Sequence, residues 1–190
     1  MAIFLDEDMV GADANVIIYP RLLLCMGVTV LMSDGWLVGG HVSDHTTELH
    51  VLGEIANQIA ARPGAHTEHL YCTGNYARHR AHGGLKVSQK AAALGYHGPA
   101  FRFDTPDYTH GTALQITSNG AGHKCSIEYK RDNKVAYQQG AGPMVAQWSS
   151  FQQQFRNVAT PKTGFAAAVP NPHQVNLSRF ALEVKRYQIP

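Results

Sequence analysis

The sequence is poor in charged residues: Asp, Glu, Lys and Arg make up 16% of its 190 residues, against roughly 25% in an average soluble domain. A long charged tail is therefore excluded, and a hydrophobic content of 44% predicts that the chain folds. Long hydrophobic runs are also missing. The longest, residues 22–32, is interrupted by Gly27 and Thr29 and is far shorter than the roughly 20 residues that span a bilayer. We expect no transmembrane helix and no membrane partner.

Cysteine is scarce as well. The three residues present, Cys25, Cys72 and Cys125, favour free thiols in a reducing cytosol over a disulfide framework, because their number is odd and low. The first eight residues hold no basic segment and contain three acids, at positions 6–8, so we expect no secretory signal. The expected location is the cytoplasm of the producing cell, or a target cell reached through a signal-peptide-independent secretion system.

The excess of positive charge is small. Sixteen Lys and Arg against 14 Asp and Glu give a net charge of +2, a field too weak to predict a nucleic-acid surface. The length suits one domain, since domains usually run to about 100–150 residues. We expect a single domain over residues 1–190, with its core in residues 1–140 and a proline-rich appendage in residues 140–190.

Hydrophobic patterning predicts strands interleaved with helices. Strands are expected at residues 13–19, 26–32, 36–42, 69–73, 99–103, 112–118 and 125–131, with a weak return at 134–138. Helices are expected at residues 46–61 and 85–94, with a further helix at 144–155 and a closing segment at 177–189. Pro20 is expected to end the first strand. This order predicts an α+β layered sandwich with a mainly antiparallel sheet and interleaved helices.

A hairpin turn places one cysteine near one histidine. Residues 33–35 end in glycine, as a three-residue turn with a bulge requires, because its last residue has a positive φ. Counting back along the two strands from this turn sets Gly27 opposite His41. Cys25 and His41 then become diagonal neighbours on one face. A two-residue loop at 34–35 would break this register.

Cys25 and His41 suit nucleophilic catalysis. A thiol with an ordinary pKa near 8.5 becomes reactive when a neighbouring imidazolium stabilises its thiolate. Gly39 and Gly40 have no side chains to block a substrate from His41, although the pair is also typical of a kink in a sheet. The backbone N–H of Cys25 or Met26 is a candidate donor to an oxyanion. The alternative is a small buried thiol beside a core histidine.

The stretch that contains Cys25 and Gly39-Gly40-His41 resembles the thiol glutamine deamidases, the superfamily of the chemotaxis receptor deamidase CheD and of cytotoxic necrotizing factor. The elements expected up to residue 103 follow in the order that CheD shows. In that superfamily a Cys that opens one strand and a His on the next form the catalytic dyad. The resemblance assigns these roles to Cys25 and His41.

The resemblance also implies a third residue that orients the histidine. CheD-like enzymes have a Thr six residues before the nucleophile, and this chain has Tyr19 there. The Tyr19 hydroxyl would donate to the imidazole; a main-chain carbonyl of residues 15–19 is the alternative. Leu24 stands where members of the superfamily usually have Gly or Ser.

By this resemblance the chain is a hydrolase that deamidates a Gln or Asn side chain of a target protein, and acts as a bacterial effector or toxin. It needs no cofactor and no metal. A thiol protease or a transglutaminase would use the same dyad, because water and amines both capture a thioester. A binding module without catalytic activity, engaging RNA or protein through residues 78–90, is an alternative of another class.

The remaining signals favour structural roles. Cys72 and Cys125 alternate with apolar residues and are expected in the core. Several histidine pairs are three or four residues apart, but none has the spacing of a structural zinc site. The basic residues at 78–82 favour a solvated loop or a docking surface for an acidic protein. Gly74 and the other isolated glycines are expected in turns.

Overall fold

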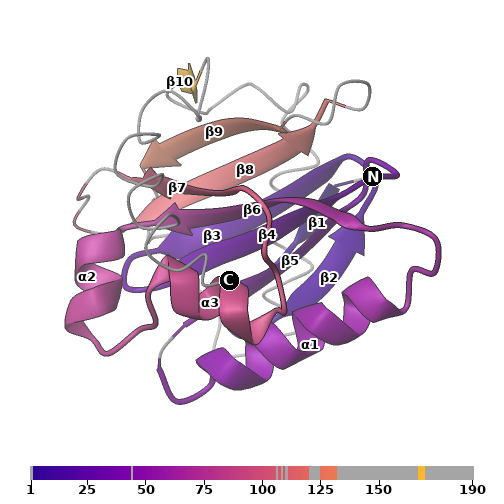
Figure 1. The fold of residues 1–190 in the computed structure, drawn as a ribbon. Helices are drawn as coiled ribbons and strands as arrows, with labels where there is room; N and C mark the ends of the chain where they lie inside the picture. The colour runs from indigo at the N-terminus through magenta and orange to yellow at the C-terminus, as the bar shows by residue number, and fades with distance from the viewer. Residues whose placement is uncertain are drawn as a thin grey trace, which may run out of the picture.

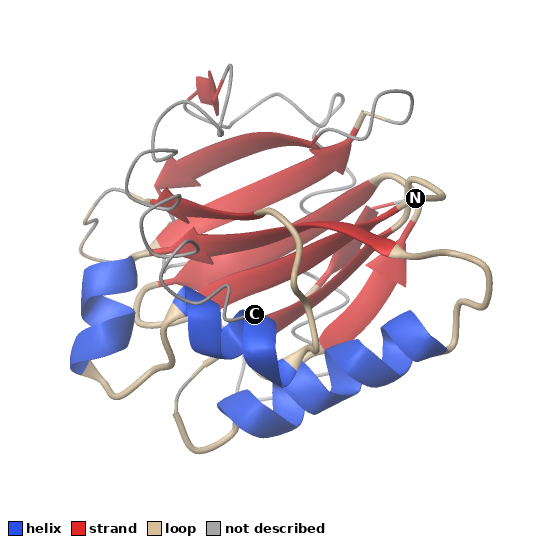
Figure 2. Ribbon diagram, in the orientation of Figure 1, coloured by secondary structure: helices blue, strands red, loops and turns tan. Residues whose placement is uncertain are grey.

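A computed structural model of the chain describes residues 2–43, 45–105, 107, 109, 111–119, 125–131 and 167–169. These residues form two five-stranded sheets, and the helices gather on one side of them (Figures 1 and 2). The α+β class is confirmed, and both sheets mix parallel with antiparallel pairing. Among the described helices, none has the length and apolar character needed to cross a membrane.

The first sheet has the order β1-β3-β8-β9-β10. Its strands are β1 (Ala2–Phe4), β3 (Val16–Leu22), β8 (Thr112–Ser118), β9 (Cys125–Arg131) and β10 (Ala167–Val169). β1 pairs with β3 in parallel, and the other pairs are antiparallel. The segments expected at 134–138, 144–155 and 177–189 lie outside the described residues.

The expectation that Pro20 ends its strand is wrong. β3 runs through Pro20 to Leu22, and its register with β8 shifts between Tyr19 and Leu22. Arg21 has φ +49° at this irregularity. A bulge accommodates proline within a sheet because the residue has no N–H to pair.

The second sheet has the order β2-β5-β4-β6-β7. Its strands are β2 (Val10–Asp13), β5 (Leu37–Val42), β4 (Met26–Met32), β6 (Thr67–Gly74) and β7 (Ala100–Asp104). β6 and β7 pair in parallel, and the other pairs are antiparallel. The sequence does not predict β2, because its pattern places Asp13 at the start of the strand expected at residues 13–19. Instead the Asp13 carboxylate accepts the N–H groups of Asn15 and Val16, which turns the chain from β2 into β3.

The hairpin of β4 and β5 has the predicted register. Gly35 has φ +82°, and the N–H of Met32 donates to the Trp36 carbonyl at 2.8 Å, which closes the turn at residues 33–35. Gly27 pairs with His41. Cys25 comes one residue before the paired part of β4, which begins with Met26 opposite Val42, so its diagonal relation to His41 stays a prediction.

Three helices pack against the second sheet. They are α1 (Glu48–Ala60), α2 (Tyr76–Ala81) and α3 (Val87–Ala93). α1 and α3 lie within their predicted ranges. α2 replaces the solvated loop expected there, and it begins after Asn75, whose side chain accepts the N–H of Arg78.

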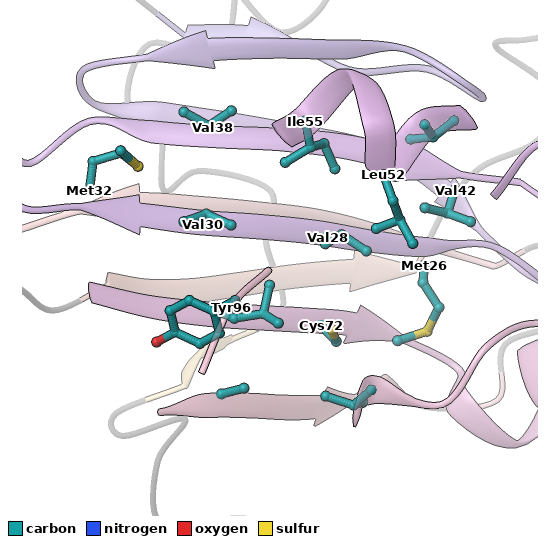
Figure 3. Close-up of a cluster of buried hydrophobic side chains, with 14 residues drawn as sticks. Met26, Val28, Val30, Met32, Val38, Val42, Leu52, Ile55, Cys72 and Tyr96 are labelled. Carbon is teal, nitrogen blue, oxygen red and sulfur yellow. The ribbon is translucent and has the colours of Figure 1, made fainter. Parts of the chain in front are cut away.

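Alternation along β4 and β5 produces two core layers. Even-numbered positions such as Val28 and Val38 face the helices, and Figure 3 shows Leu52 and Ile55 of α1 projecting toward them. Odd-numbered positions such as Leu31 face the first sheet. The layer between the sheets contains Leu5, Ile17, Tyr19, Leu22, Cys25, Leu31, Leu37, Tyr71, Phe103, Leu114, Ile116, Cys125 and Ile127.

Gly39 and Gly40 do not open a path to His41, contrary to the expectation. A methyl group at Gly40 would lie 2.8 Å from both Val51 and Ile55 of α1. A methyl group at Gly39 would overlap the Tyr19 hydroxyl. The two glycines therefore make room for core side chains on opposite faces of the sheet.

We predict that Gly39→Ala lowers the free energy of unfolding by about 1–3 kcal/mol, since overpacking a filled core displaces its side chains. Tyr19→Phe removes the overlapping hydroxyl, so Gly39→Ala should cost less in that background. Urea unfolding of the four proteins of this double-mutant cycle measures the coupling.

The matched control is Gly53→Ala in α1, where no atom lies within 4 Å of the added methyl. It should stabilise the protein by about 0.5–1 kcal/mol, because glycine disfavours a helix interior. Equal losses from Gly39→Ala with and without the Tyr19 hydroxyl would contradict the packing argument.

Candidate active site

His41 lies completely buried between the two sheets. Its Nδ1 is 2.9 Å from the carbonyl oxygen of Leu5. A carbonyl only accepts hydrogen bonds, so Nδ1 holds the proton of the neutral ring. The other ring nitrogen, Nε2, is also buried and has no hydrogen-bond partner among the residues that the structure describes. His41 therefore presents a basic nitrogen in the core with no partner among the described residues.

The segment before β2, residues 5–9, holds His41 in place; we call it the N-terminal strap. Besides the bond to the ring, the N–H of Asp8 donates to the His41 carbonyl at 2.8 Å, and the N–H of His41 donates to the Met9 carbonyl at 3.0 Å. Two strap residues thus lie opposite one residue of β5, which defines a β-bulge. Bulges of this kind re-aim a side chain.

Asp8 occupies the left-handed position of this bulge, with φ +61°. Aspartate tolerates that conformation better than most residues. Its carboxylate accepts hydrogen bonds from the hydroxyls of Ser43 at 2.6 Å and Thr47 at 2.8 Å. These bonds fix the strap to the segment that leads into α1.

Cys25 lies in the loop between β3 and β4 and is 6% exposed. Its side chain belongs to the layer between the sheets, as does the face of β5 that presents His41. Gly74, the last residue of the neighbouring strand β6, has φ +146°. A methyl group at Gly74 would lie 2.7 Å from the Cys25 carbonyl oxygen. Gly74 was expected only in a turn; its bare backbone allows β6 to approach the Cys25 loop.

Both members of the pair are neutral at pH 7 in this structure. Burial lowers the pKa of His41 to about 4, although the Leu5 carbonyl and nearby acids act in the opposite direction. Burial, reinforced by the charge of Glu7, raises the pKa of Cys25 to about 12, while backbone hydrogen bonds at Leu24 and Leu23 lower it. The expected thiolate–imidazolium pair is therefore disfavoured, because both charged forms lose their hydration. Catalysis by these two residues would instead need a neutral thiol and a neutral His41 that acts as a general base.

Tyr19 contacts His41 through its ring and not through its hydroxyl. The two ring centroids are 6.0 Å apart, with an interplanar angle of 88°. The hydroxyl donates to the Val28 carbonyl at 3.0 Å and lies 2.6 Å from Thr29 Oγ1. The expectation that this hydroxyl donates to the imidazole is wrong, because its single proton is bonded to β4.

The main-chain carbonyl of Leu5 orients the ring in place of a side chain. From the sequence, a carbonyl of residues 15–19 is the expected alternative to the Tyr19 hydroxyl, and the Leu5 carbonyl is not predicted. Every residue has a carbonyl, so no residue type signals the role. Only the position of the strap beside β5 identifies it.

The other cysteines are confirmed as core thiols. Cys72 lies in the layer between the helices and the second sheet, and Cys125 lies between the two sheets. All three cysteines are free. Burial raises the pKa of Cys125 to about 12.

Residues 78–90 do not form a continuous basic surface. Arg78 pairs with Asp107 at 2.7 Å, and Arg80 donates to the Gly84 carbonyl. His79 and Lys90 are buried, with exposures of 1% and 0%. Within the described residues, no group of three or more His, Cys, Asp or Glu side chains is placed to hold a metal ion.

Comparison with known protein families and with curated proteins finds no match for this chain. The assignment of a superfamily and of an activity therefore depends on the geometry of Cys25 and His41 and on the sequence resemblance.

We predict that His41 makes the protein less stable as the pH falls from 6.5 to 4. In that range the unfolded chain binds a proton at its ordinary pKa of 6.5, while the folded chain, with a pKa of about 4, does not. The free energy of unfolding falls by about 3 kcal/mol, and most of this loss has occurred when the pH reaches the pKa of His41 in the folded chain. His41→Asn, which keeps a donor toward the Leu5 carbonyl, should show a smaller loss.

Urea unfolding at several pH values between 7 and 4 measures this difference. The control is His97→Asn at an exposed loop position, which should leave the pH profile unchanged. If His41→Asn and His97→Asn have the same profile, the burial of a neutral His41 is refuted.

Proposed function

We propose that this chain is a thiol amidohydrolase of the deamidase superfamily that it resembles, acting on a glutamine or asparagine side chain of a target protein. One observation supports this most directly. Cys25 comes directly before β4, its side chain and His41 belong to the same layer between the sheets, and the buried Nε2 of His41 has no hydrogen-bond partner among the described residues. A cysteine that opens a strand beside such a base is the arrangement expected of the nucleophile in this superfamily.

The neutral pair defines the order of proton transfers. As the Cys25 sulfur attacks the carboxamide carbon, its proton passes to Nε2 of His41, and a C–S bond forms. The protonated His41 then donates to the departing nitrogen, which leaves as ammonia and produces a thioester. His41 next takes a proton from water, whose oxygen attacks the thioester, and the proton returns to Cys25. The target side chain gains a carboxylate and one negative charge.

The hydrogen bond to Leu5 supports this cycle. His41 becomes positively charged each time it takes up a proton. The carbonyl that accepts from Nδ1 then stabilises the imidazolium and prevents the ring from flipping. The same bond fixes the tautomer that leaves Nε2 free to accept. The strap thereby performs the role that a side chain performs in a triad.

Burial of the pair favours a side-chain amide over a peptide bond as the substrate. Cys25 is 6% exposed and lies in the loop directly before the first residue of β4. A glutamine side chain presents its carboxamide at the tip of a flexible stem and needs only a narrow entrance. A scissile peptide bond continues as main chain on both sides and needs an open groove. This favours deamidation over proteolysis.

The test is to incubate the protein with native cell lysate proteins in ¹⁸O-labelled water and to search their peptides by mass spectrometry. We predict Gln or Asn residues converted to acids that contain the heavy oxygen, which distinguishes new carboxylates from older ones. Cys25→Ala should abolish the conversion, and His41→Asn should lower its rate by about 10²–10⁴-fold, the range typical of general base catalysis.

Cys72→Ala is the matched thiol control, since that sulfur lies on the opposite face of the sheet, and it should retain activity if the variant folds. Cleaved peptides would indicate a protease, and an added primary amine cross-linked to Gln would indicate a transglutaminase. Labelling that is equal in the wild type and in Cys25→Ala would refute the thiol mechanism.

A further inference from the structure

A buried charged cluster lies behind the Cys25 loop. It consists of Glu48 in α1, His79 in α2 and Lys90 in α3, and none of these side chains is more than 1% exposed. Removing charges from water costs several kcal/mol per ion, so such a cluster is weak evidence for a stabilising role. Its function has to be sought in what it holds.

The three side chains of the cluster contact one another directly. The Lys90 ammonium donates to the Glu48 carboxylate and to the Leu85 carbonyl at 2.6 Å. The second Glu48 oxygen accepts the N–H of Leu85 at 2.6 Å. Nε2 of His79 lies 3.2 Å from the first Glu48 oxygen and 3.0 Å from the Lys90 nitrogen, so these two charged groups hold that side of the ring.

Nδ1 of His79 lies 2.9 Å from the Leu24 carbonyl oxygen, and because a carbonyl only accepts, Nδ1 donates this hydrogen bond. This bond joins α2 to the peptide unit between Leu24 and Cys25. The His79 ring packs directly against the backbone of Gly84, so closely that a methyl group at Gly84 would overlap it. This contact restricts movement of the ring. The cluster thus positions one carbonyl, directly before the candidate nucleophile.

A trans peptide unit is planar, so its C=O and N–H point in opposite directions. Holding the Leu24 carbonyl toward α2 directs the N–H of Cys25 away from α2. We propose that His79 is a positioning residue that orients the Cys25 N–H as the donor to the oxyanion formed during amide attack. This inference rests on the proposed function.

The state of Glu48 supports the same arrangement. Burial by itself would raise the pKa of Glu48, but its contacts with His79 and Lys90 and the N–H of Leu85 hold the pKa below its ordinary value. The carboxylate stays charged at neutral pH and holds His79 and Lys90 in place through these contacts.

Two substitutions of His79 separate positioning from simple stabilisation. The amide of His79→Asn matches the position of Nδ1, so it can donate to Leu24 but loses the contact with Glu48 and Lys90. The amide of His79→Gln matches the position of Nε2, so it can contact Glu48 and Lys90 but loses Leu24. A structural role favours the Gln variant, and a positioning role favours the Asn variant.

Two readouts are needed. The ¹³C shift of the Leu24 carbonyl reports its hydrogen bond independently of any activity, and kcat is measured on the intact amide form of a peptide that is found deamidated in the lysate. We expect His79→Asn to keep the wild-type shift and a kcat within about threefold. His79→Gln should lose the shift and about 10–100-fold in kcat with little change in KM, less than the full loss of an oxyanion donor.

Circular dichroism melts identify the temperature at which both variants are folded, and all measurements are made there. A kcat retained in His79→Gln, or lost equally in both variants, overturns the proposal. A wild type without amidase activity overturns the proposed function and the oxyanion role together. The Leu24 shift would then still decide whether His79 orients this peptide.

Discussion

The turn at residues 33–35 is the constraint on which the candidate site depends. It fixes the register of β4 and β5, and strand side chains alternate between faces with a period of two. A slip of one residue would move His41 from the layer between the sheets to the layer under α1. Gly35, at φ +82°, makes the three-residue turn possible. The face of the sheet on which His41 lies is therefore a consequence of one backbone conformation at the far end of the hairpin.

Burial determines the chemistry of that dyad. Between two sheets, the loss of hydration raises the pKa of Cys25 and lowers that of His41, so the pair rests in its neutral form. A neutral imidazole is a competent base, provided that its tautomer is fixed and its free nitrogen points at the thiol. The strap meets the first requirement through the Leu5 carbonyl and the bulge at Asp8. A core histidine without these features would be an ordinary packing residue.

The helices contribute more than a cover for the second sheet. Glu48, His79 and Lys90 come from three separate helices and contact one another, and His79 donates to the Leu24 carbonyl. Hydrophobic side chains of similar volume would pack there at lower cost, but they would leave the peptide before Cys25 free to rotate. The polar network restricts that peptide to one orientation. The strap thus contacts His41, and the cluster contacts the peptide before Cys25, from opposite sides of the second sheet.

Local sequence patterns were sufficient for much of this arrangement. Alternation predicted β4, β5, β8 and β9, periodicity and end signals predicted α1 and α3, and the glycine of the turn predicted the pairing of Gly27 with His41. Each of these depends on residues close together in the chain. β1 and β2 were missed because they are short and have no clear pattern, and α2 because its basic residues suggested solvent.

The partners of the site residues were decided only by the tertiary structure. The Leu5 carbonyl meets His41 across 36 positions of sequence, and His79 meets the Leu24 carbonyl across 55. Main-chain carbonyls have no sequence signature, and a basic residue in a polar helix looks the same whether or not a carboxylate lies behind it. The sequence by itself determined which residue types were available and which strand face they share. Long-range packing determined their protonation and their orientation, because hydration and hydrogen-bond partners exist only once the layers are assembled.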